Sequence, residues 1–94
     1  MGLFSNDARY STEEKVLRGE QIKHILWDKL YTIKEEHKTI VEQAIKDRRG
    51  DDKKISLEQI YQVLLKLEQA QEISNSDRHQ IMEVFKTYFE EHLS

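Results

Sequence analysis

The chain has 94 residues, of which 37% are apolar and 35% are charged, and its net charge is −3. This length suits one small domain with a thin core and excludes a large buried cavity. The absence of Cys excludes disulfides, a thiolate nucleophile and a Cys-based zinc site, while the absence of Pro and the presence of only three Gly disfavour a β-sandwich or barrel.

Residues 1–10 show no periodicity, and we expect a flexible N-terminal arm there, which Phe4 and Tyr10 would anchor. Residues 11–94 are expected to form a single helical-bundle domain. The longest apolar run, Val63-Leu64-Leu65, is far shorter than the roughly 18 residues that a membrane span needs. We therefore expect a cytoplasmic protein without a transmembrane segment.

Two helices are predicted in the first half of the chain, over residues 12–30 and 33–48. Each begins at a capping box, a pattern in which the cap side chain and a Glu three residues on bond each other's backbone N–H groups: Ser11-Thr12-Glu13-Glu14 and Thr32-Ile33-Lys34-Glu35. The apolar steps also continue through Thr32, which leaves open whether the two helices are continuous. We predict a break at Thr32, because a helix of roughly 36 residues is rare in a small domain.

Two further helices are predicted over residues 57–71 and 77–92. The third helix begins at the capping box Ser56-Leu57-Glu58-Gln59, and the fourth is capped by Ser74 or Ser76. Short connections make neighbouring helices antiparallel, so the predicted fold class is all-α, a small antiparallel four-helix bundle. The predicted core consists of Ile22, Leu26, Leu30, Ile40, Ala44, Ile60, Leu64, Ile81, Phe85 and Phe89.

The third helix carries more apolar residues than one buried face needs. At about 100° per residue its apolar side chains span an arc of roughly 200°. One interpretation is a central helix with neighbours on two sides, and the other is an exposed edge that binds another protein or a second copy of the chain. The candidate partner-binding residues are the edge residues Val63, Leu65 and Leu67, with Trp27 and Tyr61 as aromatic anchors.

The residue patterns do not indicate a catalytic site, and we predict a non-enzymatic protein without a metal or other cofactor. The histidines lack metal-ligand spacing, and neither a phosphate-binding glycine loop nor a nucleophile elbow is present. Residues 47–58 resemble an EF-hand loop, with Asp47, Asp51 and Glu58 at its first, fifth and twelfth positions. Because Asp52 stands where that loop needs Gly, we expect a metal-free connection and leave open whether it retains ion affinity.

Two family resemblances give alternatives. The segments Leu26-Trp27-Asp28-Lys29-Leu30-Tyr31 and Ser74-Asn75-Ser76, with an apolar third helix between them, resemble pediocin-like bacteriocin immunity proteins. That resemblance implies a small cytosolic four-helix bundle that protects a cell by engaging the receptor complex of the toxin. Residues 60–68 resemble the third helix of winged-helix DNA-binding regulators, but nucleic acid is not favoured as a partner because the chain is acidic.

Overall fold

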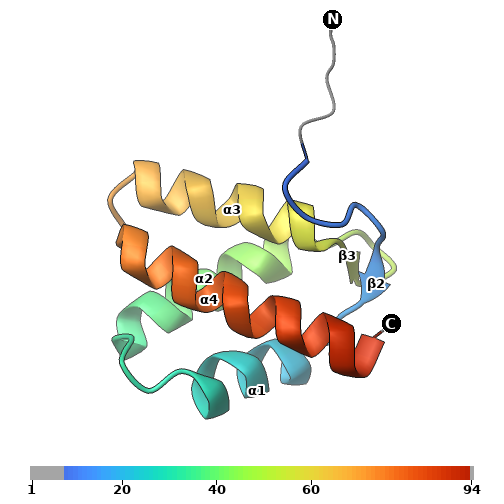
Figure 1. Ribbon diagram of the computed structural model, residues 1–94, viewed down its shortest axis with the longest axis horizontal. Coiled ribbons are helices and arrows are strands. Elements are labelled where there is room, and N and C mark those ends of the chain that lie inside the picture. The colour runs from blue at the N-terminus through green and yellow to red at the C-terminus, as the bar shows by residue number, and fades with distance from the viewer. Residues whose placement is uncertain (1–7, 94) are drawn as a thin grey trace, which may run out of the picture.

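The computed structural model describes residues 8–93 and confirms an all-α bundle of four helices (Figure 1). The chain reverses direction at each connection, so consecutive helices are antiparallel. The first and third helices lie on opposite sides of the bundle, and each packs against both of the others. The elements are α1 (Gly19–Lys29), α2 (Glu35–Arg48), α3 (Leu57–Gln69) and α4 (Asn75–Tyr88), which continues into a short π-helix, η1 (Phe89–Leu93).

Two helix starts are fixed by capping boxes. At α3, the Ser56 hydroxyl accepts the N–H of Gln59 at 3.0 Å, and the Gln59 side-chain carbonyl accepts the N–H of Ser56 at 2.9 Å. At α4, Ser74 and Asp77 exchange the equivalent bonds at 2.9 and 3.1 Å, which identifies Ser74 rather than Ser76 as the cap. These bonds satisfy N–H groups that the first turn of a helix leaves unpaired, and they confirm the predicted caps Ser56 and Ser74, although α4 begins at Asn75 and not at the predicted residue 77.

The predicted start of the first helix at Ser11 is wrong, because residues 11–18 contain no helix and α1 begins only at Gly19. Within this segment, β2 (Lys15–Val16) pairs antiparallel with β3 (Lys54–Ile55) in a two-stranded sheet. The local capping pattern predicted a helix here, but the chain pairs instead with a segment about 40 positions away. Residues near Ser11 in the sequence do not reveal such a partner.

The predicted break at Thr32 is confirmed, since α1 ends at Lys29 and α2 begins at Glu35. The capping box predicted at this point is not formed. The Thr32 hydroxyl instead donates to the side-chain carbonyl of Gln80 in α4 at 2.7 Å, and the N-cap position is taken by Lys34 without a side-chain cap bond. Thr32 thus joins the α1–α2 connection to α4 rather than starting a helix.

The core matches the predicted set except on α2. Ile40 and Ala44 are only partly buried there, whereas Val41 and Ile45 are fully buried. The apolar stripe of α2 is narrow, and each predicted core residue lies one position before the residue that is buried. Ile25 of α1, which the predicted core left out, is also fully buried. Further buried apolar residues outside the predicted core are Leu17, Ile33, Ile55, Leu57, Tyr61, Ile73 and Met82.

Lys38 is a charged residue within this core and is only 6% exposed. Its ammonium group donates to the carbonyl oxygen of Leu30, at the C-terminal end of α1, at 2.5 Å, and lies 5.8 Å from the centre of the Trp27 ring. The helix dipole favours a cation at this end of a helix, and the face of an aromatic ring attracts it further. Lys38 therefore ties α2 to the end of α1.

We predict that Lys38→Met destabilises the protein by about 1–3 kcal/mol, because the side chain keeps its apolar length while the buried Leu30 carbonyl loses its donor. Urea unfolding followed by the fluorescence of Trp27, the single tryptophan, measures this change. Lys66→Met, at an exposed position of α3, is the matched control and should change stability by less than about 0.5 kcal/mol. Equal stabilities of Lys38→Met and the wild type would contradict this role.

Candidate functional site

Helix α3 has neighbours on two sides, α2 and α4, as one of the two interpretations of its wide apolar arc predicted. Some apolar residues on its edges nevertheless keep part of their surface accessible. The buried apolar residues of α3 are Leu57, Ile60, Tyr61 and Leu64. The partly buried ones, which pack against the edge of the core, are Val63, Leu65 and Leu67. The bundle therefore absorbs most, but not all, of the arc.

The five candidate partner-binding residues do not form one patch. Helical spacing places Tyr61 and Leu65, four residues apart, on one flank of α3 and places Val63 and Leu67 on the other. Trp27 belongs to α1, on the opposite side of the bundle from α3 (Figure 1). A continuous surface around Tyr61 therefore includes Leu65 but not Trp27.

The flank that carries Tyr61 is where α3 meets the N-terminal part of the chain. We call the stripe of Glu58, Tyr61, Leu65 and Glu68 the Tyr61 flank, because residues three or four positions apart share one side of a helix. Tyr61 is only 7% exposed. The ring of Tyr10 packs on it, with the two ring centres 5.2 Å apart.

Residues 8–14, which we call the strap, cross α3 near its beginning (Figure 1). The predicted flexible arm of residues 1–10 largely precedes the strap. Its residues 1–7, with the predicted anchor Phe4, lie outside the described residues. The other predicted anchor, Tyr10, does contact the bundle, through Tyr61 of α3.

Two cations from different parts of the chain lie over the Tyr61 ring. The guanidinium carbon of Arg9, in the strap, is 6.0 Å from the ring centre, and that of Arg78, in α4, is 5.7 Å away. Arg78 also donates to one carboxylate oxygen of Glu68, and Asn75 donates to the other at 3.3 Å. Because the ring face attracts cations, Tyr61 is the centre of a cluster that joins α3, α4 and the strap.

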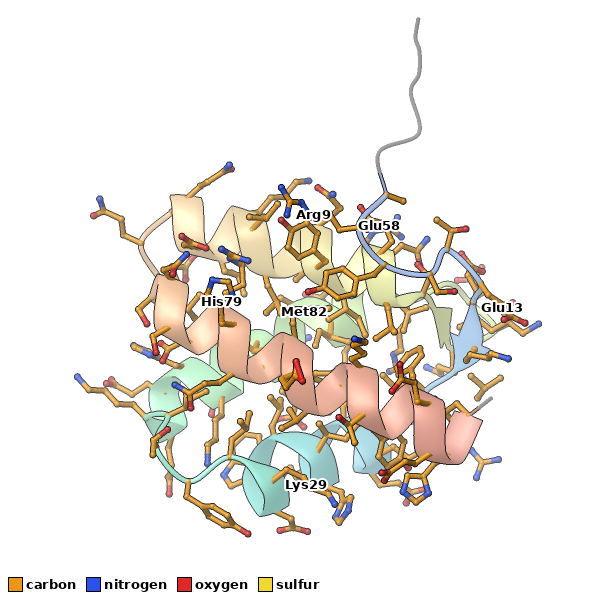
Figure 2. The ribbon with its side chains drawn as sticks, in the orientation of Figure 1. Arg9, Glu13, Lys29, Glu58, His79 and Met82 are labelled. Atoms are coloured by element: carbon orange, nitrogen blue, oxygen red, sulfur yellow. The ribbon has the colours of Figure 1, made fainter. Side chains whose placement is uncertain are left out.

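The carboxylate of Glu58 holds the main chain of the strap, and Figure 2 shows it beside Arg9 where the strap crosses α3. Its Oε1 accepts the N–H of Arg9 at 3.0 Å and that of Tyr10 at 3.1 Å, while Oε2 accepts the side-chain amide of Gln62 at 2.8 Å. The backbone N–H of Glu58 donates to the carbonyl of Ser11 at 3.1 Å. Hydrogen bonds to an ionised acceptor are stronger than neutral ones, so Glu58 is the main polar attachment of the strap.

A cleft of about 310 Å³ opens beside the strap, between the beginning of α3 and the end of α4. Tyr10, Leu57 and Phe89 give it an apolar lining, and charged side chains of both signs surround them. Two of these charges, Lys15 and Glu13, are paired with each other at 3.1 Å. The mixture of charges gives the cleft no preference for an anion or a cation, and it extends the apolar surface on which the strap lies.

Two of the three carboxylates at the EF-hand-like positions form other bonds. Asp47 accepts the side-chain amide of Gln43 at 2.8 Å, and Glu58 holds the strap. Asp52, at the position where that loop needs Gly, accepts the N–H of Lys54 at 3.1 Å. Within residues 8–93 there is no group of three or more acidic or histidine side chains that would hold a metal ion.

Sequence reasoning missed Arg9, Glu58 and Arg78 as members of this site. Arg9 and Glu58 are 49 positions apart, and Arg78 reaches Glu68 from ten positions away in the next helix. No local spacing marks such pairs. Helical periodicity does mark Tyr61 and Leu65 as candidate residues, and the aromatic Tyr10 was the signal that predicted an anchor from the arm.

Comparison with known proteins gives no match to a protein-family model, a curated protein or a solved structure. The resemblances to bacteriocin immunity proteins and to winged-helix regulators therefore stay predictions. No helix in the described part of the chain combines the length and the apolar character that crossing a bilayer requires.

The hydrogen bond from Arg78 lowers the pKa of the Glu68 carboxyl below its ordinary value, and the bond from Asn75 lowers it further. A carboxyl whose pKa is lower in the folded than in the unfolded state stabilises the fold above its ordinary pKa, which is about 4.3 for Glu. This stabilisation is lost as the pH falls through the lowered pKa.

We predict that Glu68→Gln lowers stability more at pH 7 than at strongly acidic pH. Below about pH 4.3 the wild type progressively loses the contribution of Glu68, whereas the variant has no carboxyl to titrate at this position. Urea unfolding midpoints at neutral and acidic pH measure the difference, and Glu72→Gln, in the exposed α3–α4 connection, is the matched control. A gap between wild type and Glu68→Gln that does not change with pH would rule out this role for Glu68.

Proposed function

We propose that the protein is a small non-enzymatic interaction module that binds another protein through the Tyr61 flank of α3. The observation that carries this proposal is that a non-helical segment, the strap, covers Tyr61 in addition to helix packing, while Leu65 one turn further keeps part of its surface accessible. Tyrosine and arginine are among the residue types that dominate binding energy at protein interfaces, and the flank combines both.

The polar groups of the flank support binding rather than chemistry. The Glu58 carboxylate accepts bonds from the strap and from Gln62, and the Glu68 carboxylate accepts bonds from Arg78 and Asn75. A general acid or base must exchange its proton with a substrate within hydrogen-bond reach. Both carboxylates are instead engaged in bonds that hold parts of the chain together.

The other flank of α3 is not included in the proposed surface. Arg78 of α4 reaches Tyr61, so the opposite flank, with Val63 and Leu67, is on the side of α2. These two side chains pack against the core as Leu65 does, but the strap that covers Tyr61 lies on the side of α4. We also leave Trp27 out, because the Lys38 ammonium lies against its ring in the contact that ties α1 to α2.

We predict that Leu65→Glu weakens binding of the partner protein by about 10- to 100-fold. Burying a leucine side chain contributes about 1.5–3 kcal/mol, and a carboxylate at that place loses this term. Tagged wild type and variant are compared by quantitative capture from cells that produce the protein, and circular dichroism checks that helicity is retained.

The matched control is Lys66→Glu, which places a carboxylate at the exposed position next to Leu65, about 100° further around α3 and off the Tyr61 flank. A partner lost with Leu65→Glu and kept with Lys66→Glu supports the proposal. Identical capture by both variants and by the wild type, together with unchanged sedimentation, would refute it. If the lost partner is a second copy of the chain, the protein is a homodimer that uses the same flank.

A further inference from the structure

We propose that the strap occupies, within the same molecule, the site at which the Tyr61 flank binds a short non-helical segment of a partner protein, bent as the strap is at Arg9 and Tyr10. This inference rests on the function proposed above and adds the chemistry of the partner and the regulation of the site. The partner segment carries a basic residue followed by an aromatic one, as Arg9 and Tyr10 of the strap do. The protein is self-inhibited, and a partner binds only when the strap leaves the flank.

The contacts of the strap show how the flank recognises a bent chain. Glu58 Oε1 accepts two consecutive N–H groups, those of Arg9 and Tyr10, and the N–H of Glu58 donates to the carbonyl of Ser11. Consecutive N–H groups of a straight strand point to opposite sides, so the chain has to bend at these two residues, as the strap does. All three bonds use main-chain groups, which any segment that bends in this way also offers. Main-chain bonds of this kind supply affinity in peptide recognition, whereas side-chain contacts supply specificity.

The side-chain contacts favour one type of segment. An aromatic ring at the second position packs on Tyr61, as Tyr10 does at 5.2 Å between ring centres. A cation at the first position lies over the same ring, as Arg9 does at 6.0 Å. The carboxylate of Glu58 beside them adds a negative charge that complements a basic residue.

The strap is held less firmly than the chain that follows it. Its residues are exposed except for Tyr10, which is partly buried. From residue 15 onward the chain is fixed, because β2 pairs with β3 and Leu17 is fully buried. The Leu17 carbonyl also accepts the guanidinium of Arg49 at 2.6 Å. The strap can therefore leave without opening the core, as weakly packed segments of proteins do.

When a segment of the same molecule occupies the site, a partner can bind only those molecules in which the site is open. The apparent affinity is then the intrinsic affinity multiplied by the fraction of open molecules. Short tethers give such an occupant an effective concentration in the range of about 1 mM. Changing a strap side chain should therefore raise the affinity for a segment added separately, whereas removing the Glu58 carboxylate from such a variant should lower it. These opposite effects distinguish a self-inhibited site from a strap that only stabilises the fold.

The test uses the full chain and a fluorescent peptide with the sequence of residues 8–14, titrated by fluorescence anisotropy. Tyr10→Ala in the protein is expected to bind this peptide at least about tenfold more tightly than the wild type does. Adding Glu58→Ala to Tyr10→Ala should abolish that binding, and adding Glu58→Gln, which keeps a carbonyl acceptor, should retain part of it. A control peptide that carries Tyr10→Ala should not bind any of these proteins.

Equal affinities of the wild type and Tyr10→Ala, or no binding to Tyr10→Ala up to millimolar peptide, would overturn the proposal. Circular dichroism checks folding, and Arg9→Ala, which changes an exposed strap side chain, replaces Tyr10→Ala if that variant unfolds. A wild-type dimer in sedimentation that dissociates in Tyr10→Ala would show that the strap of a second copy is the occupant, and would overturn the assignment to a partner protein.

Failure of this test is separable from failure of the proposed function, because Leu65→Glu changes the flank and leaves every strap residue in place. A partner lost with Leu65→Glu, combined with no effect of Tyr10→Ala on peptide binding, retains the interaction role and rejects self-inhibition. Peptide binding that depends on Glu58, combined with unchanged partner capture by Leu65→Glu, retains the strap site and rejects the surface proposed around Leu65.

Discussion

The carboxylate of Glu58 joins the two parts of the chain on which the candidate site depends. It stands in the first turn of α3 and accepts the N–H groups of Arg9 and Tyr10, which are 49 and 48 positions away. Ordering each residue of the strap costs about 1–2 kcal/mol of conformational entropy, and a bond to an ionised carboxylate offsets only part of that cost. The packing of the Tyr10 ring on Tyr61 therefore contributes the rest of the stabilisation that keeps the strap in place.

Local sequence patterns predicted the start of a helix correctly where the capping bonds form between residues that are close in the sequence. The capping boxes at Ser56 and Ser74 are satisfied within three residues, so both caps were predicted correctly. The same pattern at Ser11 failed, because Glu14 bonds the side chain of Gln59 instead of its own cap, and the chain beyond it pairs with β3. The buried face of α2 was predicted incorrectly because a lysine such as Lys38 is normally exposed. Its burial depends on the hydrogen bond to the Leu30 carbonyl, which the sequence does not reveal.

The candidate site was predictable only in its helical part. The apolar arc of α3 is wide, as predicted, although α2 and α4 cover most of it, and periodicity named Leu65 as an edge residue and Tyr61 as an aromatic anchor. What covers Tyr61 could not be inferred, since the strap was expected to be a flexible arm or the first turn of a helix. The end of α3 also lacks its usual signal in the sequence. Gln71 adopts a positive φ of 62° there, a conformation that glycine takes more readily, so the helix ends without a glycine to mark it.

The position of the strap in the isolated protein is tested most directly by proton NMR of the wild-type chain at neutral pH. A nuclear Overhauser effect between the ring protons of Tyr10 and Tyr61 is predicted, because the ring centres are 5.2 Å apart. Slow hydrogen exchange at the N–H groups of Arg9 and Tyr10 should accompany it, since both are bonded to Glu58. A folded bundle that shows neither the ring contact nor protection of these two amides would contradict the account.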